Sequence, residues 1–388
     1  MRFRLTMLVA ALGVVTGCQE APTAITAPPP SLGEGLRAAA SLANDAPQPS
    51  SVRWNRAAIA LFRARGGNAG RMTAYLSLAQ YRAVLAAQDR RHGQDRPSPA
   101  GAAAAASVVV LKQFYPGDAA AIDAALATQR TELPLGTERN KDFEAGEAIG
   151  REVAAGVVAF AASDNFGLTS PGVPPVGPGY WTSSGAAIVR GGLGARPFFL
   201  TSASELRSAP PPPFGSPAYL TALAEVRAIA LGRTPEQVAI VLKWVPFSGP
   251  VFNGIVADLI EKYHRSELEA ARVLAYANAA AFDAIIACFD TKFAYWFIRP
   301  TQADPTIPLA TGLPNHPSYP SAHSCETGAF HGVLADAFPA ERAMLDAVAQ
   351  EASMSRVYGG IHYRFDGDAG LALGRAAAAL ALRRQGLE

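Results

Sequence analysis

The sequence predicts an all-α protein built from one or more helical bundles. Apolar residues recur at helical spacing through most of the chain after residue 50, and stretches with the alternating pattern of strands are sparse. The chain has 388 residues, of which 49% are hydrophobic and 17% charged, which is ample for a well-buried core. Its net charge of +2 gives no case for nucleic-acid binding or for strong attraction to a membrane surface.

The first 18 residues are predicted to be an export signal. Arg2 and Arg4 give a basic start, and residues 5–15 form a mostly apolar run too short to span a bilayer comfortably. The run Val-Thr-Gly-Cys18 resembles a bacterial lipobox, which implies cleavage before Cys18 and its lipidation. An ordinary secretory signal with a chance cysteine is the alternative. Gln19 in place of Asp favours the periplasmic face of the outer membrane, so the expected location is that of an exported, lipid-anchored protein.

Three parts are expected along the chain. Residues 1–18 are the signal, residues 19–50 a tether rich in proline and alanine, and residues 51–388 the helical domain. Within that domain we expect an N-terminal bundle over about 51–250 and a C-terminal bundle over about 251–388 that carries the chemistry. No run besides the signal is expected to be long and apolar enough to cross a membrane.

Helices are predicted where the apolar period is 3.6, and signals that start or end helices set their limits. Thr234 followed by Pro235, for example, is typical of an N-cap and first helical residue. Residues 163–218, which are rich in proline and glycine, are predicted to be irregular, and long loops of this kind are commonly lids or bridges. The predicted helices are 54–66, 70–90, 102–115, 119–132, 143–162, 217–231, 235–245, one or two within 255–290, 321–338, 340–358 and 368–384.

Three short clusters between residues 292 and 366 carry most of the chemistry-bearing side chains. In order they read K-F-A-Y-W-F-I-R-P from Lys292, Y-P-S-A-H-S from Tyr319, and S-R-V-Y-G-G-I-H-Y-R-F-D from Ser355. They supply one lysine, arginines, a serine and two of the chain's six histidines. A tetrahedral oxyanion is bound by such a set of fixed cations, hydroxyl and backbone donors, with a nucleophile and a proton donor beside it.

The spacings within the clusters suit helices. Lys292 and Arg299 are seven residues apart, so we expect them on one helix face, with Pro300 ending that helix. Pro320 suits a helix start, where free backbone amides attract an anion. His362 and Asp366 are four apart, so the carboxylate can orient the imidazole. Each pair alone is usually a solvated helix face, a cap or a surface hydrogen bond; the three clusters together indicate one site.

The combined pattern K-x6-R-P, P-S-x-H and S-R-x5-H-x3-D resembles the signature of the type 2 phosphatidic acid phosphatase and vanadium-dependent haloperoxidase superfamily. One departure is Ala322, where the superfamily usually has glycine, although alanine keeps the backbone N–H that the superfamily uses there. Looser upstream elements, such as Trp54-Asn and the Arg233-Thr-Pro-Glu-Gln run before Trp244, resemble soluble bacterial haloperoxidase-like proteins. The resemblance thus covers most of residues 52–388 and implies stacked helical bundles around a buried oxyanion pocket.

The resemblance also implies roles for individual residues. His362 would bond the central atom of the oxyanion, vanadium or phosphorus, and Asp366 would orient His362. His323 would be the general acid–base on the opposite side. The residues that would surround the oxygens are Lys292, Arg299, Ser321, Ala322 and Arg356.

Two activities are compatible with this set. With vanadate as cofactor, the pocket would oxidise a halide with hydrogen peroxide; without a cofactor, it would hydrolyse a phosphomonoester through a phospho-His362 intermediate, with His323 as general acid. The haloperoxidase is favoured for three reasons: the chain is longer than a minimal secreted acid phosphatase of this superfamily, its upstream half resembles haloperoxidase-like proteins, and His316 falls where bromoperoxidases of this superfamily carry histidine. Phe289 occupies the other position that shapes the halide site. His316 as a mere turn residue beside Pro317 is the alternative reading. A lipoprotein that binds an oxyanion and catalyses nothing is the third possibility.

Cys288 and Cys325 flank the clusters. In an exported protein they could form a disulfide, but two buried thiols are the favoured expectation.

Overall fold

The computed structural model describes residues 48–90, 96–132, 140–245 and 248–387. In these ranges the chain forms helices joined by irregular segments, and extended backbone pairs only in two isolated β-bridges, which confirms the all-α prediction. The signal at 1–18, Cys18 and the tether up to residue 47 lie outside the described residues. The α-helices are α2 (Ser50–Arg65), α3 (Ala69–Asp89), α4 (Pro99–Phe114), α5 (Ala119–Thr131), α6 (Phe143–Ala162), α7 (Pro217–Leu231), α8 (Pro235–Lys243), α9 (Ser248–Lys262), α10 (Glu267–Tyr295), α11 (Pro300–Ala303), α12 (Ala322–Ala337), α13 (Arg342–Tyr358) and α14 (Arg364–Arg384).

Local sequence sets most helix starts. The side chains of Asn68, Ser98 and Asp142 each accept a hydrogen bond from a first-turn amide of α3, α4 and α6. Thr234 caps α8 in a full capping box with proline at the first helical position, as predicted. Ser266 forms a second capping box with Glu269, and this box splits the predicted stretch 255–290 into α9 and α10.

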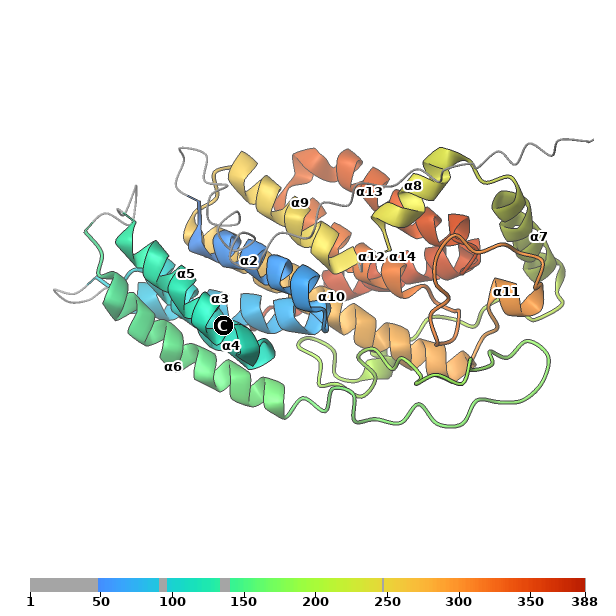
Figure 1. Ribbon diagram of the computed structural model, residues 1–388, viewed down its shortest axis with the longest axis horizontal. Coiled ribbons are helices and arrows are strands. Elements are labelled where there is room, and N and C mark those ends of the chain that lie inside the picture. Colours follow the sequence, from blue (N-terminus) through green and yellow to red (C-terminus); the bar gives the residue numbers. More distant parts are fainter. Residues whose placement is uncertain (1–47, 91–95, 133–139, 246–247, 388) are drawn as a thin grey trace, which may run out of the picture.

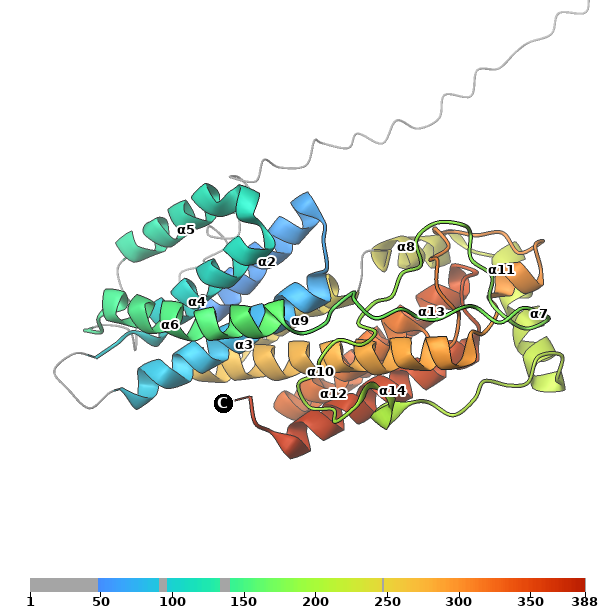
Figure 2. The ribbon, with the colours of Figure 1, turned by 90° about the horizontal axis from the view of Figure 1, so that it is seen from below.

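Helix α10 is the central element of the molecule (Figures 1 and 2). It packs against α3, one of the N-terminal helices α2 to α6, on one side and against α12 and α14 on the other. By length and composition α10 could cross a membrane, so the expectation that the described domain holds no such run was wrong. Because 83% of its most apolar window is buried inside the protein, α10 is the core helix around which the other helices pack.

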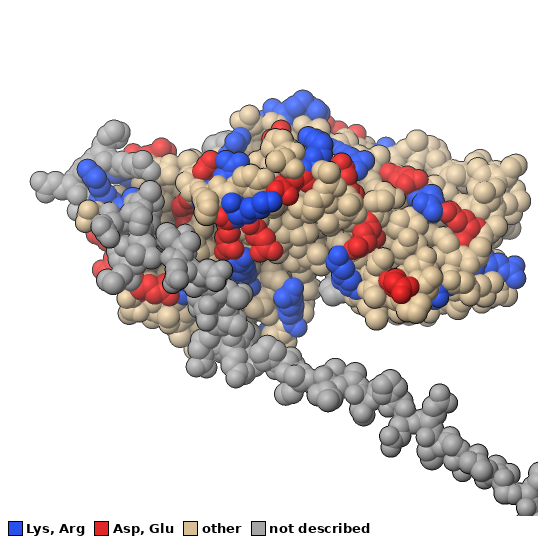
Figure 3. Space-filling view, turned by 90° about the horizontal axis from the view of Figure 1, so that it is seen from above, with Lys and Arg blue, Asp and Glu red and all other residues tan. Residues whose placement is uncertain are grey.

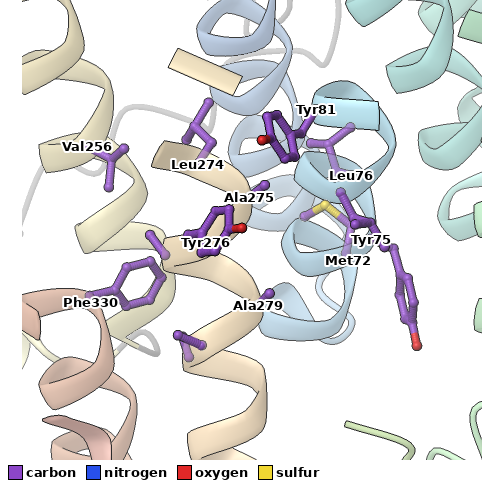
Figure 4. Close-up of a cluster of buried hydrophobic side chains, with 14 of the residues drawn as sticks. Met72, Tyr75, Leu76, Tyr81, Val256, Leu274, Ala275, Tyr276, Ala279 and Phe330 are labelled. Carbon is purple, nitrogen blue, oxygen red and sulfur yellow. The ribbon is translucent and has the colours of Figure 1, made fainter. Parts of the chain in front are cut away.

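The main hydrophobic core runs along both sides of α10. Figure 4 shows its middle, where Met72 and Tyr81 of α3 and Phe330 of α12 approach the alanine-rich face of α10. Tyr81 meets Tyr276 edge-on at 6.2 Å. The small side chains of Ala275 and Ala279 are fully buried and let the neighbouring helices approach closely.

The long irregular segment between α6 and α7 bridges the two ends of the molecule, as Figure 2 shows. It is anchored to α10 by Asp283, whose buried carboxylate accepts hydrogen bonds from the amides of Phe198, Phe199 and Leu200. Burial raises the pKa of Asp283 to about 6, against the lowering effect of those amides.

Charge is mixed over the outer surface. Figure 3 shows lysine and arginine interspersed with aspartate and glutamate on the face it presents. Many of these charges pair, as Arg56 does with Asp258 at 3.0 Å. Exposed pairs of this kind contribute little to stability, so the unusual electrostatics of the chain lie inside it.

Candidate active site

The site forms where α10 ends. Trp296 adopts a left-handed conformation with a φ of 51°, and its amide donates to the carbonyl of Lys292, which terminates the helix. Arg299 therefore lies in extended backbone beyond α10, and the prediction that it shares a helix face with Lys292 was wrong. Pro300 does not end α10; it is the first residue of the short α11, and a residue before proline avoids the helical conformation.

The bridging segment fixes the extended stretch that leads to Arg299. The amide of Trp181 donates to the carbonyl of Trp296 at 2.7 Å, and the amide of Ile298 donates to the carbonyl of Gly179 at 3.0 Å. The two tryptophan rings stack at 6.0 Å. The predicted loop thus acts as a bridge that positions the site.

Lys292 is fully buried at the end of α10. Its Nζ donates to three backbone carbonyls, those of Pro317, Ser318 and Pro320. It therefore holds the segment that leads into Ser321, while its charge remains in the site. Burial is the main cause that lowers the pKa of Lys292 to about 8, helped by the nearby charge of Arg299.

Arg299 is also fully buried and joins the other clusters. Its Nε donates to the carbonyl of His316 at 2.9 Å and its Nη1 to the carbonyl of Ile361 at 2.7 Å. Its Nη1 lies 3.4 Å from Nε2 of His362, and its Nη2 lies 3.0 Å from Nδ1 of His316. A guanidinium can only donate, so Nε2 of His362 faces it with a lone pair. Nδ1 of His316 lies equally close, at 3.0 Å, to the carbonyl of Pro317.

His362 is held through its other nitrogen. Its Nδ1 lies 2.8 Å from Oδ2 of Asp366, the predicted spacing of four residues. The same oxygen accepts from the hydroxyl of Ser318 at 2.6 Å and from the amide of Tyr363 at 3.2 Å. The carboxylate therefore fixes the hydrogen of His362 on Nδ1 and leaves Nε2 as the free lone pair.

The pKa values of this pair move in opposite directions from their usual values. Burial first, and then the charges of Arg299 and Lys292, hold the pKa of His362 well below its usual range. Burial raises the pKa of Asp366 to about 6, while the hydrogen bond from Ser318 opposes that rise. At neutral pH the pair is a neutral imidazole beside an ionised carboxylate.

The start of α12 faces this pair. Ser321 is the N-cap of α12, and its hydroxyl accepts from the amide of Ser324. The amide of Ser321 donates to the carbonyl of Asp366 at 2.9 Å, which ties the starts of α12 and α14 together. The N–H of Ala322 belongs to the first turn, whose amides have no intrahelical acceptor and attract an anion. Helix α12 begins at Ala322, one residue after the predicted start at Ser321.

Arg356 and His323 approach from α13 and α12. Arg356 is 3% exposed, its Nε donates to the hydroxyl of Ser355 at 3.0 Å, and burial lowers its pKa to about 10. His323 is half-buried, and its Nε2 lies 2.9 Å from the carbonyl of Trp244, the C-cap of α8. Because a carbonyl only accepts, the ring hydrogen of His323 lies on Nε2.

Buried positive charge exceeds buried negative charge here. Lys292, Arg299 and Arg356 are at most 3% exposed, and Asp366 is the carboxylate among them. Burying cations without partners is costly, so this arrangement is built for an anion. Among the residues that the structure describes, no three His, Cys, Asp or Glu side chains gather into a cation site.

The two halide-pocket candidates lie beside this cluster. Phe289 is 1% exposed and meets the ring of His316 edge-on at 5.3 Å, with Nζ of Lys292 6.0 Å from its centroid. Burial, with the charges of Lys292 and Arg299, keeps the pKa of His316 well below its usual range. His316 is thus a buried partner of Arg299 and more than a turn residue.

The two cysteines behind the site are buried free thiols. Cys288 lies close to the carbonyl of Pro320, with 3.8 Å between its sulfur and that oxygen. Burial is the main cause that raises the pKa of Cys325 well above its usual value, so this thiol stays protonated.

Two partners of the site were not predicted from sequence. Ser318 shares Oδ2 of Asp366 with His362, and the carbonyl of Trp244 sets the orientation of His323. Ser318 precedes the P-S-x-H cluster by only a few residues, but nothing in its spacing points to Asp366. A backbone carbonyl carries no sequence signal at all.

The predicted clusters match a known family. Residues 272–387 match the model of the PAP2 superfamily. Over these C-terminal residues the chain resembles the PAP2 superfamily. It is an enzyme of the haloperoxidase or phosphatase type that this superfamily contains. A search of curated protein sequences found no match to the chain.

Solved structures similar to this chain extend the likeness in fold beyond the matched region. A bacterial vanadium-dependent iodoperoxidase has a TM-score of 0.72 at 22% identity, over 87% of this chain and 95% of the other. A bacterial vanadium-dependent chloroperoxidase has a TM-score of 0.62 both in its apo form, at 16% identity over 80% and 93% of the two chains, and in its holo form, at 15% over 81% and 92%. At these identities the likeness establishes a shared fold.

Proposed function

We propose that this protein is a vanadate-dependent haloperoxidase that oxidises a halide, bromide in the first instance, with hydrogen peroxide. The observation that carries the proposal is the chain of contacts from Arg299 through His316 to Phe289. Neutralising an oxyanion needs cations alone. A neutral imidazole and an aromatic ring placed against one of those cations add the partly apolar surface on which a weakly hydrated halide can rest.

The residues present fit a vanadate. A tetrahedral oxyanion needs positive charge around its oxygens and one lone pair for the metal, and Nε2 of His362 offers that lone pair beside Arg299. Arg299, Arg356 and the N–H of Ala322 would hold the oxygens. Lys292 would contribute its charge while it holds the segment before Ser321. Bound vanadate would supply the Lewis-acidic centre that activates peroxide toward halide.

Residues of the chain itself would hold and transfer the protons at this centre. Asp366 keeps the hydrogen of His362 on Nδ1, and burial keeps that imidazole neutral. His323, which is half-buried, would accept and return the protons of peroxide while the Trp244 carbonyl holds its ring. The likeness of the whole fold to peroxidases supports this reading.

Phosphomonoester hydrolysis is the second candidate. It is favoured by the same lone pair on His362, because a neutral imidazole oriented by a carboxylate is a good nucleophile for phosphorus. His362 would take the phosphoryl group, His323 would protonate the leaving oxygen, and water would then release phosphate.

One experiment separates these functions, because vanadate promotes one and blocks the other. The full-length chain is assayed with and without orthovanadate, for bromination with peroxide and bromide and for hydrolysis of an aryl phosphate. Bromination that requires vanadate and disappears in His362→Ala supports the proposal. Phosphate release inhibited by vanadate overturns it in favour of the phosphatase. Inactivity in both assays, with vanadate still bound, would leave an oxyanion-binding lipoprotein.

We also propose that the enzyme is exported and anchored by lipid at Cys18, as the lipobox pattern suggests. Metabolic labelling with a radioactive fatty acid tests this. Label should enter the wild-type chain and be absent from Cys18→Ser; equal labelling of both would contradict the anchor.

A further inference from the structure

A cavity of about 460 Å³ lies beside the site, between the start of α3, the middle of α10 and the bridging segment. Its size falls in the range of pockets for small organic molecules, about 300–1,000 Å³. Its walls are largely apolar and aromatic. The residues that matter here are Phe166, Ile188, Phe282, Ile285, Phe289 and Glu326.

Phe289 belongs both to the wall of the cavity and to the surroundings of the active site. Phe289 lines the cavity and meets His316 edge-on at 5.3 Å, and His316 contacts Arg299. Gly191 also packs against this ring: a Cβ at position 191 would come within 2.2 Å of Phe289, and its φ of 53° suits glycine. One aromatic ring thus separates the cavity from the groups around the oxyanion.

Glu326 supplies a polar anchor in this apolar cavity. It lies one helical turn after His323 on α12 and is 3% exposed. Its Oε2 accepts from the hydroxyl of Ser248 and from the amide of Gly249 at 3.1 Å. A Cβ at Gly249 would come within 2.7 Å of its Oε1, so this glycine makes room for the oxygen, whereas a Cβ at Gly70 would lie at an ordinary contact distance of 3.6 Å.

We propose that this cavity binds the organic substrate of the enzyme, an electron-rich aromatic molecule with a hydroxyl group. Its ring would lie among Phe282, Ile285 and Phe289, and its hydroxyl would donate to Oε1 of Glu326. Apolar and aromatic walls select an aromatic body, and the single buried carboxylate selects one hydrogen-bond donor. Burial raises the pKa of Glu326 to about 7, so above neutral pH it is ionised and accepts from the hydroxyl.

The chemistry rests on the proposed haloperoxidase function. Bromide loses two electrons, which enter the O–O bond of peroxide and break it. The ring forms a C–Br bond and releases its displaced hydrogen as a proton. That proton and one more from solvent complete two water molecules. A hydroxyl hydrogen-bonded to a carboxylate pushes electron density into the ring, which favours attack on an electrophilic halogen.

Binding is tested first, by calorimetry at pH 8 on the full-length chain with 2-naphthol and its methyl ether, which lacks the donor. We expect 2-naphthol to bind about tenfold more tightly than the ether, the effect of a hydrogen bond to a charged group. Glu326→Gln should abolish most of that preference. Ile285→Trp, which fills the cavity, should weaken both ligands at least tenfold, and so should Val189→Trp at its exposed rim. Val273→Trp, on α10 away from the cavity, is the control for added bulk.

Turnover is tested next, with two reactions. Oxidation of iodide to triiodide needs no organic substrate and should be unchanged in Ile285→Trp, whereas bromination of 2-naphthol should fall. If wild-type enzyme oxidises no halide, the proposed function fails while calorimetry still decides the cavity. If Ile285→Trp and Val189→Trp bind 2-naphthol as wild type does, the cavity proposal is overturned and the proposed haloperoxidase function is unaffected. Equal binding of 2-naphthol and its methyl ether would contradict the proposed role of Glu326 as the acceptor of the substrate hydroxyl.

Discussion

The two histidines proposed to be catalytic, His362 and His323, are held in opposite ways. His362 is 3% exposed and is fixed through Nδ1 by Asp366, which is itself fixed by Ser318 and Tyr363. His323 is half-buried and is held through Nε2 by the Trp244 carbonyl. One imidazole therefore presents Nε2 from a rigid, dry network, and the other keeps its hydrogen on Nε2 in a more open place.

This difference fits two kinds of work. A group that bonds the central atom must be neutral, oriented and shielded from water, which the His362 network provides. A group that moves protons must exchange them with solvent, which half-burial allows. The following predictions, in order of decreasing effect, test whether the two sides differ in this way.

Removing His362 should have the largest effect. His362→Ala deletes the lone pair that bonds the oxyanion, so kcat/KM should fall by at least about 10³-fold, the scale seen when a central catalytic group is lost. Steady-state kinetics and vanadate binding by calorimetry measure this. His264→Asn is the matched control, because His264 is exposed and has a φ of 49° that asparagine tolerates. Vanadate-dependent turnover surviving in His362→Ala would rule out the assigned role.

His323→Ala should lower kcat by about 10²-fold, since proton transfer by a positioned side chain is worth at least that much. Vanadate should still bind, because the His362 side stays intact. Added imidazole should restore part of the activity here, where the site is half-open, and should restore none in the buried site of His362→Ala. Equal rescue of both variants would contradict the difference between the two sides.

Asp366→Asn should lower turnover by about 10- to 100-fold by loosening the orientation of His362. Burial raises the pKa of Asp366 to about 6, so the wild-type carboxylate is ionised above that pH and neutral below it. Activity should therefore be retained above about pH 6 and decline as pH falls through it. His362 cannot cause this decline, because its own pKa lies well below its usual range. A pH–rate profile of Asp366→Asn should lack the limb near pH 6; an unchanged limb would assign it to another group.

His316→Phe should have the smallest effect. It removes the ring nitrogen that lies 3.0 Å from Nη2 of Arg299, a polar contact worth about 1 kcal/mol, so KM for bromide should rise about fivefold while kcat changes less. Comparing KM for bromide, iodide and chloride measures this. No change for any halide would place His316 outside the halide site.

Local physics made much of the fold predictable. The limits of α6 and α7 were predicted to the residue, and the capping signal at Thr234 was confirmed. The pair His362–Asp366 forms at its predicted spacing, because four residues bring two side chains together across a helix start. Helix α10 was underestimated, since its apolar composition alone does not tell a core helix from a membrane span.

The failures concern contacts that no local pattern encodes. Arg299 was expected on α10, but Trp296 ends that helix in a left-handed turn and the bridging segment holds the chain extended from there. Lys292 was expected to neutralise the oxygens of the oxyanion, and no sequence pattern indicated that its Nζ also donates to three carbonyls more than twenty residues further on.

By itself the sequence determined the helices, their caps, the superfamily and the identity of the charged residues, because these depend on spacing and on residue type. The tertiary structure alone decided how those residues are used. It set which ring nitrogen of each histidine is hydrogen-bonded and which cation, Lys292, donates to backbone carbonyls. It also set which aromatic ring, that of Phe289, lies between the site and the cavity that contains Glu326. Such choices depend on carbonyls and side chains brought together from distant segments, and a periodic pattern carries no information about them.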